Sequence, residues 1–481
     1  MKQVRVWSVR HARALEHLLK LFQSIAPLLR PGVAKIGARR VERLIAPVER
    51  AAKGFFFDCH MCGRCTLSST GMACPMNCPK SHRNGPCGGV GADGSCEMER
   101  TMRCVWLEAL DGTRRMQGGQ AILRIQPPVD RRLNGSSAWV RMIMGEEPAV
   151  QPAAPGTPEA TAAHAPGSLE RACRSGRFVV AAELSPPDSA DPAELLRRAA
   201  ALRGLVDAIN LTDGAGANCH MSSLAASAVL AANGYAPVFQ IACRDRNRIA
   251  IQGDILGASA LGVRNLLCVT GDSVGNGDHP DARDVFDLDA VSLLEIARGM
   301  RDRGTYASGR RLGARPALFL GATSNPFAPP FEARVINLEK KIEAGAQFIQ
   351  TQYCFDAPLL QSFMREARAR DLHRRCRILV GVGPLASARA ARWMVAHVPG
   401  VHIPEGVIRR MEQSKDAARE GVRICAEIIG EMRAIEGIAG AHIMAHRRED
   451  LVREIIAEAG IASVPAPDPR GIPLNSHAGG S

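Results

Sequence analysis

Long apolar runs are missing from this chain of 481 residues. No stretch reaches the roughly 18 consecutive apolar residues that a membrane-spanning helix needs. The first residues carry charges every few positions, among them Arg5, Arg10 and Lys20, whereas a secretory signal needs an unbroken apolar stretch. We therefore expect a cytoplasmic protein without a transmembrane segment.

Aromatic residues are also scarce, at 4% of the chain, and the standard zinc-finger spacings of nucleic-acid-binding modules are absent. These absences argue against a nucleic-acid-binding protein, although the net charge of +13 and the cysteines keep a zinc-containing protein of that class as an alternative. P-loop, HExxH and GxSxG patterns do not occur either, so those common catalytic signatures are missing.

The positive charge is concentrated in residues 1–50, which hold 11 Lys or Arg against 3 Glu and so carry +8 of the total. Five apolar residues recur there at helical spacing: Leu15, Leu18, Leu19, Phe22 and Ile25. This periodicity predicts a basic amphipathic helix that ends before Pro27. Such a helix either docks on the next domain or presents its basic face to an acidic partner or, by peripheral contact, to a membrane surface.

Two stretches without apolar periodicity divide the chain. Residues 146–170 are rich in Ala, Pro, Gly and Thr, which predicts a flexible linker. Residues 466–481 have a similar composition and predict a disordered tail. The other predicted parts are the basic helical segment 1–50, a cysteine-rich domain at 51–145 and a long domain at 171–465.

The long domain contains eight short apolar runs that alternate with helical stretches. The runs begin near residues 178, 208, 236, 265, 317, 348, 377 and 439. Continuous apolar runs predict strands buried on both faces, and their alternation with helices predicts parallel pairing. Eight such units favour an α/β fold of the (β/α)8 TIM barrel type, with a doubly wound open sheet as the alternative. Four polar residues end such runs and would share the mouth of a barrel: Glu183, Thr212, Asp272 and Gln352.

Eight of the 15 cysteines fall within the cysteine-rich domain, and in a reducing compartment this clustering favours metal ligation over disulfides. They are Cys59, Cys62, Cys65, Cys74, Cys78, Cys87, Cys96 and Cys104. Eight thiolates can complete two four-sulfur sites, which either four-iron four-sulfur clusters or structural zinc ions can occupy. The C-x2-C-x2-C and C-x3-C-P spacings resemble parts of the bacterial ferredoxin pattern and favour the clusters. A metal that only folds the region is the alternative.

Two carboxylates are candidates for acid–base chemistry. Glu183 ends an apolar run just before Pro186, and burial there would raise its pKa and suit a general acid. Asp272 follows Gly271, which lets a cofactor approach the backbone. Taken singly, each could instead be a helix cap or a loop carboxylate with satisfied hydrogen bonds.

The sequences AELSPP, INLTDGA, CVTGD, NLEKKIEAGAQFIQTQYCFD and ILVGVGP occur in an order and spacing that resembles the methylenetetrahydrofolate reductase family. The cysteine-rich domain, through CGRCTLSSTGMACP, NCPK and NGPCGG, resembles the domain that accompanies this reductase in acetogens and other bacteria. The resemblance implies a flavoprotein oxidoreductase of one-carbon metabolism that contains FAD or FMN. Its reaction would convert 5,10-methylenetetrahydrofolate into 5-methyltetrahydrofolate, or run in reverse.

The resemblance also assigns roles to individual residues. Glu183 matches the catalytic glutamate that protonates a folate nitrogen, and Asp272 matches the catalytic aspartate near flavin and pterin. Gln352 matches a glutamine that contacts folate or nicotinamide. The positions that contact flavin are matched by Thr212, Gly271, Asp272, Asn337 and Lys341.

Five positions depart from the NADH-dependent bacterial members of the family: Gln240, Thr270, Arg334, Ala390 and Met394. The changes fall on contacts to the flavin tail and to nicotinamide, so they argue against direct use of NADH. We therefore expect electrons to enter through the cysteine-rich domain from a ferredoxin-like or NAD(P)H-oxidising partner. A non-catalytic scaffold or regulator is the alternative, but retention of both catalytic carboxylates argues against it.

Overall fold

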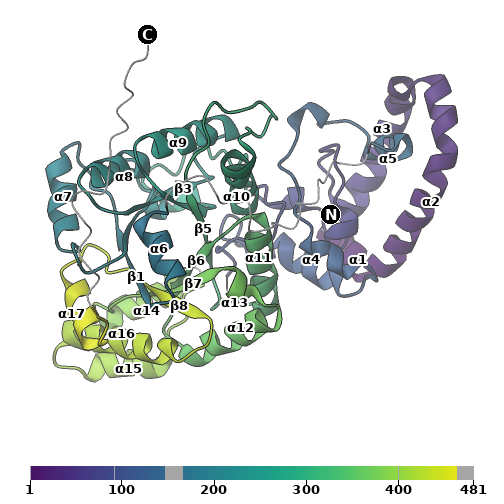
Figure 1. Cartoon of the computed structure of the whole chain (residues 1–481). Coiled ribbons are helices and arrows are strands. Elements are labelled where there is room, and N and C mark those ends of the chain that lie inside the picture. The colour runs from purple at the N-terminus through teal and green to yellow at the C-terminus, as the bar shows by residue number, and fades with distance from the viewer. Residues whose placement is uncertain (1, 92, 147–165, 399, 463–481) are drawn as a thin grey trace, which may run out of the picture.

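The computed structural model describes residues 2–91, 93–146, 166–398 and 400–462. Eight parallel strands close into a barrel in the order β1 to β8, so the predicted TIM barrel is confirmed and the open sheet is not formed (Figure 1). All eight predicted runs are strands. Their bounds are β1 Val179–Leu184, β2 Ala208–Leu211, β3 Pro237–Ala242, β4 Asn265–Val269, β5 Phe319–Ser324, β6 Phe348–Tyr353, β7 Arg377–Val382 and β8 Ile438–Ile443.

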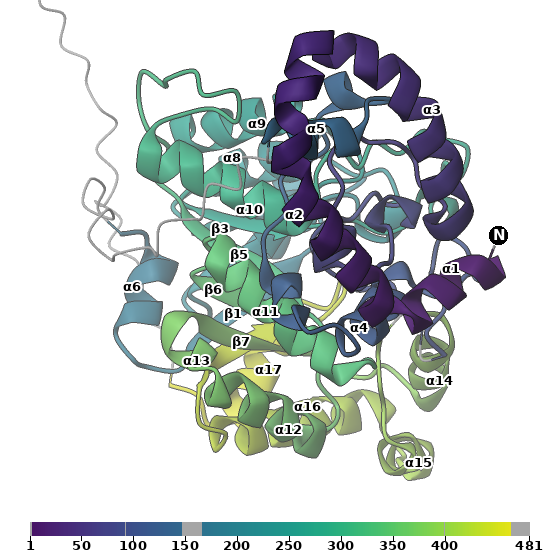
Figure 2. The same ribbon diagram turned by 90° about the vertical axis from the view of Figure 1, so that its right-hand side faces the viewer.

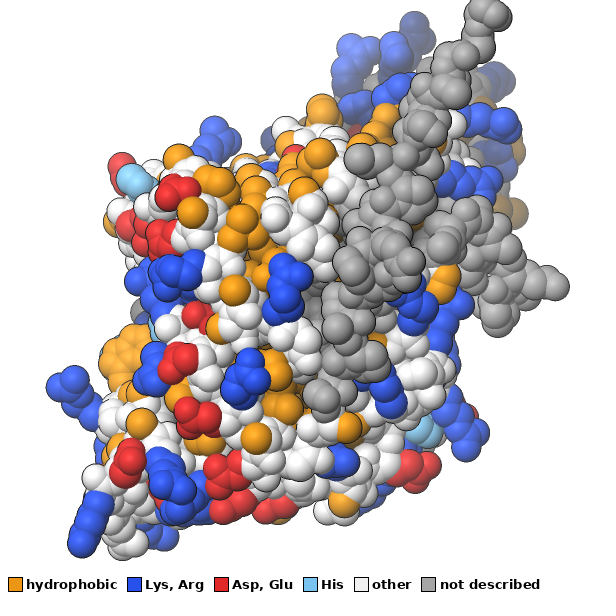
Figure 3. All heavy atoms as spheres, turned by 60° about the vertical axis from the view of Figure 1, so that its left-hand side comes forward, with side chains coloured by type: hydrophobic (Ala, Val, Ile, Leu, Met, Phe, Trp, Pro, Cys, Tyr) orange, Lys and Arg blue, Asp and Glu red, His pale blue; other side chains and the backbone are white. Residues whose placement is uncertain are grey.

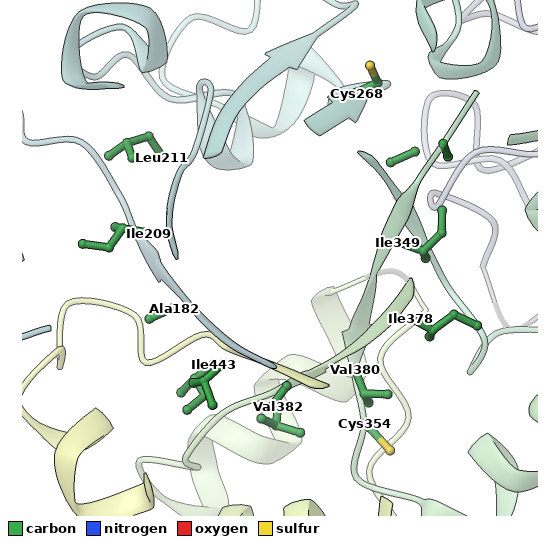
Figure 4. Close-up of a cluster of buried hydrophobic side chains, with 14 of the residues drawn as sticks. Ala182, Ile209, Leu211, Cys268, Ile349, Cys354, Ile378, Val380, Val382 and Ile443 are labelled. Carbon is green, nitrogen blue, oxygen red and sulfur yellow. The ribbon is translucent and has the colours of Figure 1, made fainter. Parts of the chain in front are cut away.

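Helices surround the barrel because each strand turns every second side chain outward. The outward side chains, such as Ile209, Ile349 and Val380, point away from the barrel centre (Figure 4) and are fully or almost fully buried in one large apolar cluster with the helices. The helices are α7 Pro192–Ala200, α8 Ser223–Ala232, α9 Arg248–Ala260, α10 Ala290–Arg298, α11 Phe331–Ala344, α12 Ala357–Ala369, α13 Leu372–Arg375, α14 Ala388–His397, α15 Glu405–Gln413, α16 Ala417–Arg433 and α17 Leu451–Glu458.

The amino-terminal end of the barrel is filled by apolar side chains. Val179, Phe319 and Phe348 point inward there, and the rings of Phe319 and Phe348 stack with centroids 5.0 Å apart. Helix α6, Ser168–Arg174, covers this end with Leu169. Because one end is closed by packing, polar side chains can gather only toward the carboxyl ends of the strands.

The part of the chain before residue 146 forms a second body beside the barrel. Its helices are α1 Lys2–Arg10, α2 Ala12–Ile36, α3 Ala38–Phe57, α4 Val105–Thr113 and α5 Ala138–Met144. The cysteine-bearing loops lie between α3 and α4, and α2 and α3 are its most prominent helices (Figure 2). A buried ion pair between Arg5 and Glu108, 3.0 Å long, joins α1 to α4. We call residues 51–145 of this body the cysteine module.

The predicted end of the first long helix is wrong. Helix α2 continues through Pro27 and Pro31 to Ile36. Proline removes one helical hydrogen bond, but both rings lie on the exposed side of α2, where water can hydrate the carbonyl groups that lose their partners.

The predicted linker and tail fall largely outside the described residues. This applies to residues 147–165 of the linker and to the whole of 466–481. The last residues assigned to the linker, from Ser168, instead begin helix α6. Within the described ranges, no helix is both long enough and apolar enough to cross a membrane.

Candidate functional site

Three of the predicted residues lie at the carboxyl end of the barrel. Strand alternation points Glu183 and Thr212 inward, whereas Gln352 lies in a β-bulge of its strand and accepts a 3.0 Å hydrogen bond from the Tyr353 backbone N–H. Glu183 lies in β1, Thr212 directly follows β2, and Gln352 lies in β6. The Glu183 side chain is about a quarter exposed, so its burial is less complete than the sequence predicted. The Thr212 hydroxyl oxygen is buried and has no hydrogen-bond partner within the described chain. A ligand in the mouth would therefore find an unsatisfied hydroxyl beside an accessible carboxylate.

Behind Glu183 lies a polar network that the sequence analysis missed. Nε2 of the buried His442, in β8, is 3.6 Å from Oε2 of Glu183. Nε2 of Gln350 lies 3.4 Å from the other ring nitrogen of His442, and Gln350 also exchanges two hydrogen bonds with Asn210. Strand alternation places all four side chains on the inward face, so the period-two pattern of AGAHIM could have revealed His442.

Asp272 lies in the loop after β4, beside a residue of the cysteine module. Its Oδ2 accepts a hydrogen bond of 3.1 Å from the backbone N–H of Gly216. Gly271 has a φ of +95°, and a Cβ there would lie 2.8 Å from Cβ of Arg244, so glycine is required. The Lys80 ammonium group donates a 2.7 Å hydrogen bond to the Gly271 carbonyl oxygen.

Lys80 connects this loop to the cysteines. Its side chain is buried and forms an ion pair with Glu97, whose carboxylate lies 3.9 Å from the Cys87 sulfur. The negative charges of Cys87, Glu97 and Asp272 raise the pKa of Lys80 against the opposing effect of burial, which is the largest single influence. A fixed positive charge therefore stands between a cysteine and a predicted catalytic carboxylate.

The predicted flavin-contacting residues of α11 lie under the cysteine module. Asn337 Nδ2 donates a 3.4 Å hydrogen bond to the Asn84 carbonyl oxygen, and Lys341 Nζ donates one of 2.6 Å to the Thr323 carbonyl oxygen at the end of β5. Burial, aided by the charge of nearby Arg334, lowers the pKa of Lys341 to about 8. The module therefore covers this side of the mouth.

Residues 82–87 of the module form much of this contact. The Arg83 backbone N–H donates a 2.9 Å hydrogen bond to Asp289 at the start of α10, and the Asn84 amide reaches the same carboxylate at 3.1 Å. Arg334 of α11 donates a 2.9 Å hydrogen bond to the Cys87 carbonyl oxygen. Arg334, one of the five departures from the family pattern, thus anchors the module.

The eight cysteines separate into two sets of four neighbours. The first set is Cys59, Cys62, Cys65 and Cys74, and the second set is Cys78, Cys87, Cys96 and Cys104. Burial and then the charges of the other three members raise the pKa of Cys74 to about 12. Burial raises the pKa of Cys104 to about 12, with a smaller contribution from the charge of Cys87 and a still smaller one from Cys96.

The first set lines a cavity together with Lys53, Phe57 and Ser136. Among the described residues, no group of three or more His, Cys, Asp or Glu side chains is arranged so that it could hold a metal ion. The metal prediction therefore stays a prediction. Buried thiols with raised pKa values nevertheless suit a cation, because metal binding supplies the charge that stabilises thiolates.

Comparison with known families assigns the chain. A family model described as methylenetetrahydrofolate reductase matches residues 168–460, which include every strand of the barrel. The chain belongs to the methylenetetrahydrofolate reductase family. A second model, described as methylene-tetrahydrofolate reductase C terminal, matches residues 38–132, which hold all eight clustered cysteines. The family predicted from sequence is thus confirmed.

A curated relative and two solved structures show similarity to the chain. A probable methylenetetrahydrofolate reductase (NADPH) from Caenorhabditis elegans is 26% identical over 249 residues, half of this chain, and the chain covers only 34% of that relative. An uncharacterized protein from Clostridium thermocellum, described as binding two copies of 5-methyl-5,6,7,8-tetrahydrofolic acid, has 13% identity and a TM-score of 0.44, over 60% of this chain and 97% of its own. A 2,3-dimethylmalate lyase has 13% identity and a TM-score of 0.34, over 60% of this chain and 84% of its own.

Proposed function

We propose that the barrel catalyses the interconversion of 5,10-methylenetetrahydrofolate and 5-methyltetrahydrofolate. The observation that carries the proposal is the carboxylate of Glu183 at the mouth of a barrel of this family, with His442 3.6 Å behind it. Glu183 is accessible enough to meet a substrate, and His442 is buried and held by Gln350. A paired carboxylate and imidazole suit proton transfer to a substrate nitrogen.

Glu183 is the proton donor in this proposal. It protonates the folate nitrogen of the five-membered bridge, so that the ring opens to an iminium whose methylene carbon accepts a hydride. His442 orients Glu183, since both its nitrogens face polar groups of the inner network. Asp272 adds a negative charge at the mouth, which stabilises the cationic folate species.

We propose that a flavin binds at one side of the mouth. When bound, a reduced flavin supplies the hydride for this chemistry. Thr212 would hold it with its unsatisfied hydroxyl, and Gly271 would allow close backbone approach. Asn337 and Lys341 already bond to backbone carbonyl groups under the cysteine module. A bound FAD or FMN would therefore have residues 80–85 of the module as neighbours on that side. Gln352 remains the proposed contact to folate.

The cysteine module is proposed to hold two metal sites, one in each set of four cysteines. Four-iron four-sulfur clusters would let electrons enter from a ferredoxin-like or NAD(P)H-oxidising partner, whereas zinc would be structural. The second set supports electron entry, because Cys87 connects through Glu97 and Lys80 to the loop of Gly271. This chain of contacts brings the module to the catalytic mouth.

A single anaerobic experiment tests the proposed reaction. The absorption spectrum of the purified protein is recorded before and after addition of 5-methyltetrahydrofolate. We expect flavin bands that bleach as the methyl-folate is oxidised, over broad cluster absorption. A protein that is colourless, takes up no added flavin and ignores reduced folates would contradict the proposal and favour a non-catalytic scaffold.

Metal analysis of the same sample tests the electron-entry proposal separately. Iron and sulfide in equal amounts, near eight atoms of each per chain, are expected for two four-iron clusters. Zinc without iron would refute electron entry through the module and leave the barrel chemistry unaffected.

A further inference from the structure

Helix α2 has two adjacent apolar faces, and the described residues cover one of them. Phe22, Ala26 and Val33 pack against α5. Next to them, a row of large side chains faces solvent: Leu18, Leu21, Ile25, Leu28 and Leu29, with exposed fractions of 62%, 58%, 41%, 78% and 43%. Their spacing of mostly three and four residues puts them on one side of the helix.

Helix α3 repeats this arrangement. Val41 and Ile45 face α5, whereas Leu44, Val48 and Phe55 are 74%, 59% and 62% exposed. Both helices lie on the side of the cysteine module that is farther from the barrel (Figure 1). We call these exposed residues of α2 and α3 the outer stripe.

The charges around the outer stripe have one sign. Among the side chains of α1 to α3 whose burial is described, nine basic ones are exposed: Arg10, Arg13, Lys20, Arg30, Lys35, Arg39, Arg40, Arg43 and Arg50. The carboxylates of these helices turn toward the module. Glu16 and Glu49 are buried, and Glu42 accepts a 2.8 Å hydrogen bond from the Ser137 backbone N–H. No exposed carboxylate lies within the described residues of α1 to α3.

This pattern differs from that of the barrel. On the barrel face in Figure 3, acidic and basic side chains are interspersed, as on an ordinary solvated surface. Unlike that face, the α2–α3 surface combines long aliphatic side chains with an unbalanced positive charge. A surface of this kind matches a partner that is apolar inside and negatively charged outside.

We propose that the outer stripe docks on the surface of an anionic lipid bilayer. The aliphatic side chains enter the boundary between headgroups and acyl chains, and the flanking arginines and lysines contact lipid phosphates. A second copy is a poorer occupant, because two such surfaces would bring like charges together. A protein partner is also a poorer match, because the centres of protein interfaces favour aromatic side chains, whereas this stripe is mainly aliphatic.

Vesicle flotation with the full-length protein tests this proposal. The probes are vesicles of phosphatidylcholine alone and vesicles that also contain phosphatidylglycerol. We expect at least about ten-fold more protein to float with the anionic vesicles at low salt, and high salt to reduce the difference. Equal recovery with both vesicles, or none with either, would overturn the proposal.

Matched variants locate the surface. The triple variant Arg39→Gln, Arg40→Gln, Arg43→Gln removes charge, and Leu21→Gln with Leu28→Gln removes apolar area. Each should reduce flotation several-fold, with folate turnover and the thermal unfolding midpoint unchanged. Equally exposed barrel residues provide the controls, Arg374→Gln, Arg419→Gln and Arg453→Gln for charge, and Ile249→Gln with Leu261→Gln for apolar area.

Two results would assign the outer stripe differently. If the control variants reduce flotation as much as the α2–α3 variants do, vesicle binding is a general effect of surface charge and apolar area, and the proposal is overturned. A dimer in analytical ultracentrifugation that dissociates in the Leu21→Gln, Leu28→Gln variant, without vesicle binding by the parent protein, would assign the stripe to a second copy. Neither result depends on folate chemistry, so this proposal and the proposed reaction can fail separately.

Discussion

Glu183 is the residue on which the proposed chemistry depends most directly. Glu183→Gln keeps the size and the hydrogen-bonding capacity of the side chain but cannot donate a proton. We expect folate turnover to fall by about 10²- to 10⁴-fold, the usual contribution of a general acid, while flavin reduction by an external donor persists. Stopped-flow absorbance separates the two half-reactions. Undiminished folate turnover would remove Glu183 from this role.

The buried His82 predicts that the protein loses stability as the pH falls. This side chain is buried between the module and the barrel, and this burial lowers its pKa from 6.5 to about 4, outweighing the neighbouring charge of Asp289. Between these values the unfolded chain binds a proton that the folded protein does not, so stability is fully present above pH 6.5 and falls as the pH drops toward 4. The loss is on the order of 3 kcal/mol.

The variant His82→Gln should lose less stability on acidification than the parent protein. Urea unfolding at pH 7 and at pH 5 measures the difference, with His402→Gln as the control because His402 is exposed. An identical acid loss in parent and His82→Gln would show that other groups carry the effect.

At the scale of elements, the strands were predictable and the helix end was not. Eight apolar runs and their alternation with helices identified every strand of the barrel, since burial on both faces leaves a strong signal. Pro27 did not end α2. The free-energy cost of a proline inside a helix depends on whether water can hydrate the backbone carbonyl that loses its hydrogen bond, and the sequence alone does not show this. His442 was within reach of the same strand pattern and was overlooked.

A close contact of Gly112 within the cysteine module predicts that a glycine-to-alanine substitution in a helix lowers the stability of the protein instead of raising it. Gly112 lies inside α4, where alanine normally stabilises a helix by up to about 1 kcal/mol. A Cβ at this position would lie 1.9 Å from the Gly71 carbonyl oxygen, and α4 would have to move off the loop. We expect Gly112→Ala to destabilise the protein by about 1–3 kcal/mol, as overpacking usually does.

Gly430 of α16 is the matched control. It is also helical, but a Cβ there would have nothing within 4 Å. Gly430→Ala should therefore raise the thermal unfolding midpoint slightly, while Gly112→Ala lowers it and reduces the metal content of the module. Equal shifts in both variants would contradict the close packing of α4 on Gly71.

At the scale of the whole molecule, the contact between module and barrel could not be predicted from sequence. The family resemblance implied flavin contacts for Lys341 and Asn337, and the cysteine spacing predicted a metal at Cys87, but no periodic pattern relates residues about 250 positions apart. Arg334 illustrates the gap. Sequence marked it only as a departure from the family, whereas in the structure it donates to the Cys87 carbonyl oxygen.

The buried pair of Lys80 and Glu97 is where the two bodies are coupled most closely to the proposed site. Lys80→Met would leave Glu97 buried without its partner, which typically costs about 3–5 kcal/mol. The double variant Lys80→Met, Glu97→Gln removes that charge as well and should fold. Without the bond from Lys80, the Gly271 carbonyl is free to move and the backbone next to Asp272 is less firmly held, while the Gly216 hydrogen bond to Asp272 remains.

We expect the double variant to lower kcat/KM for folate by about 10- to 100-fold, because small misplacements of a site residue have effects of that size. Metal content and flavin content should stay at parent levels. The single variant Lys80→Arg, which keeps a cation beside Glu97, should be more active than the double variant. Lys415→Met, at an exposed lysine of the barrel, serves as the control. Full activity in the double variant would mean that the contacts from Cys87 through Lys80 do not position the Asp272 loop for catalysis, although Arg83, Asn84 and Arg334 still anchor the module to the barrel.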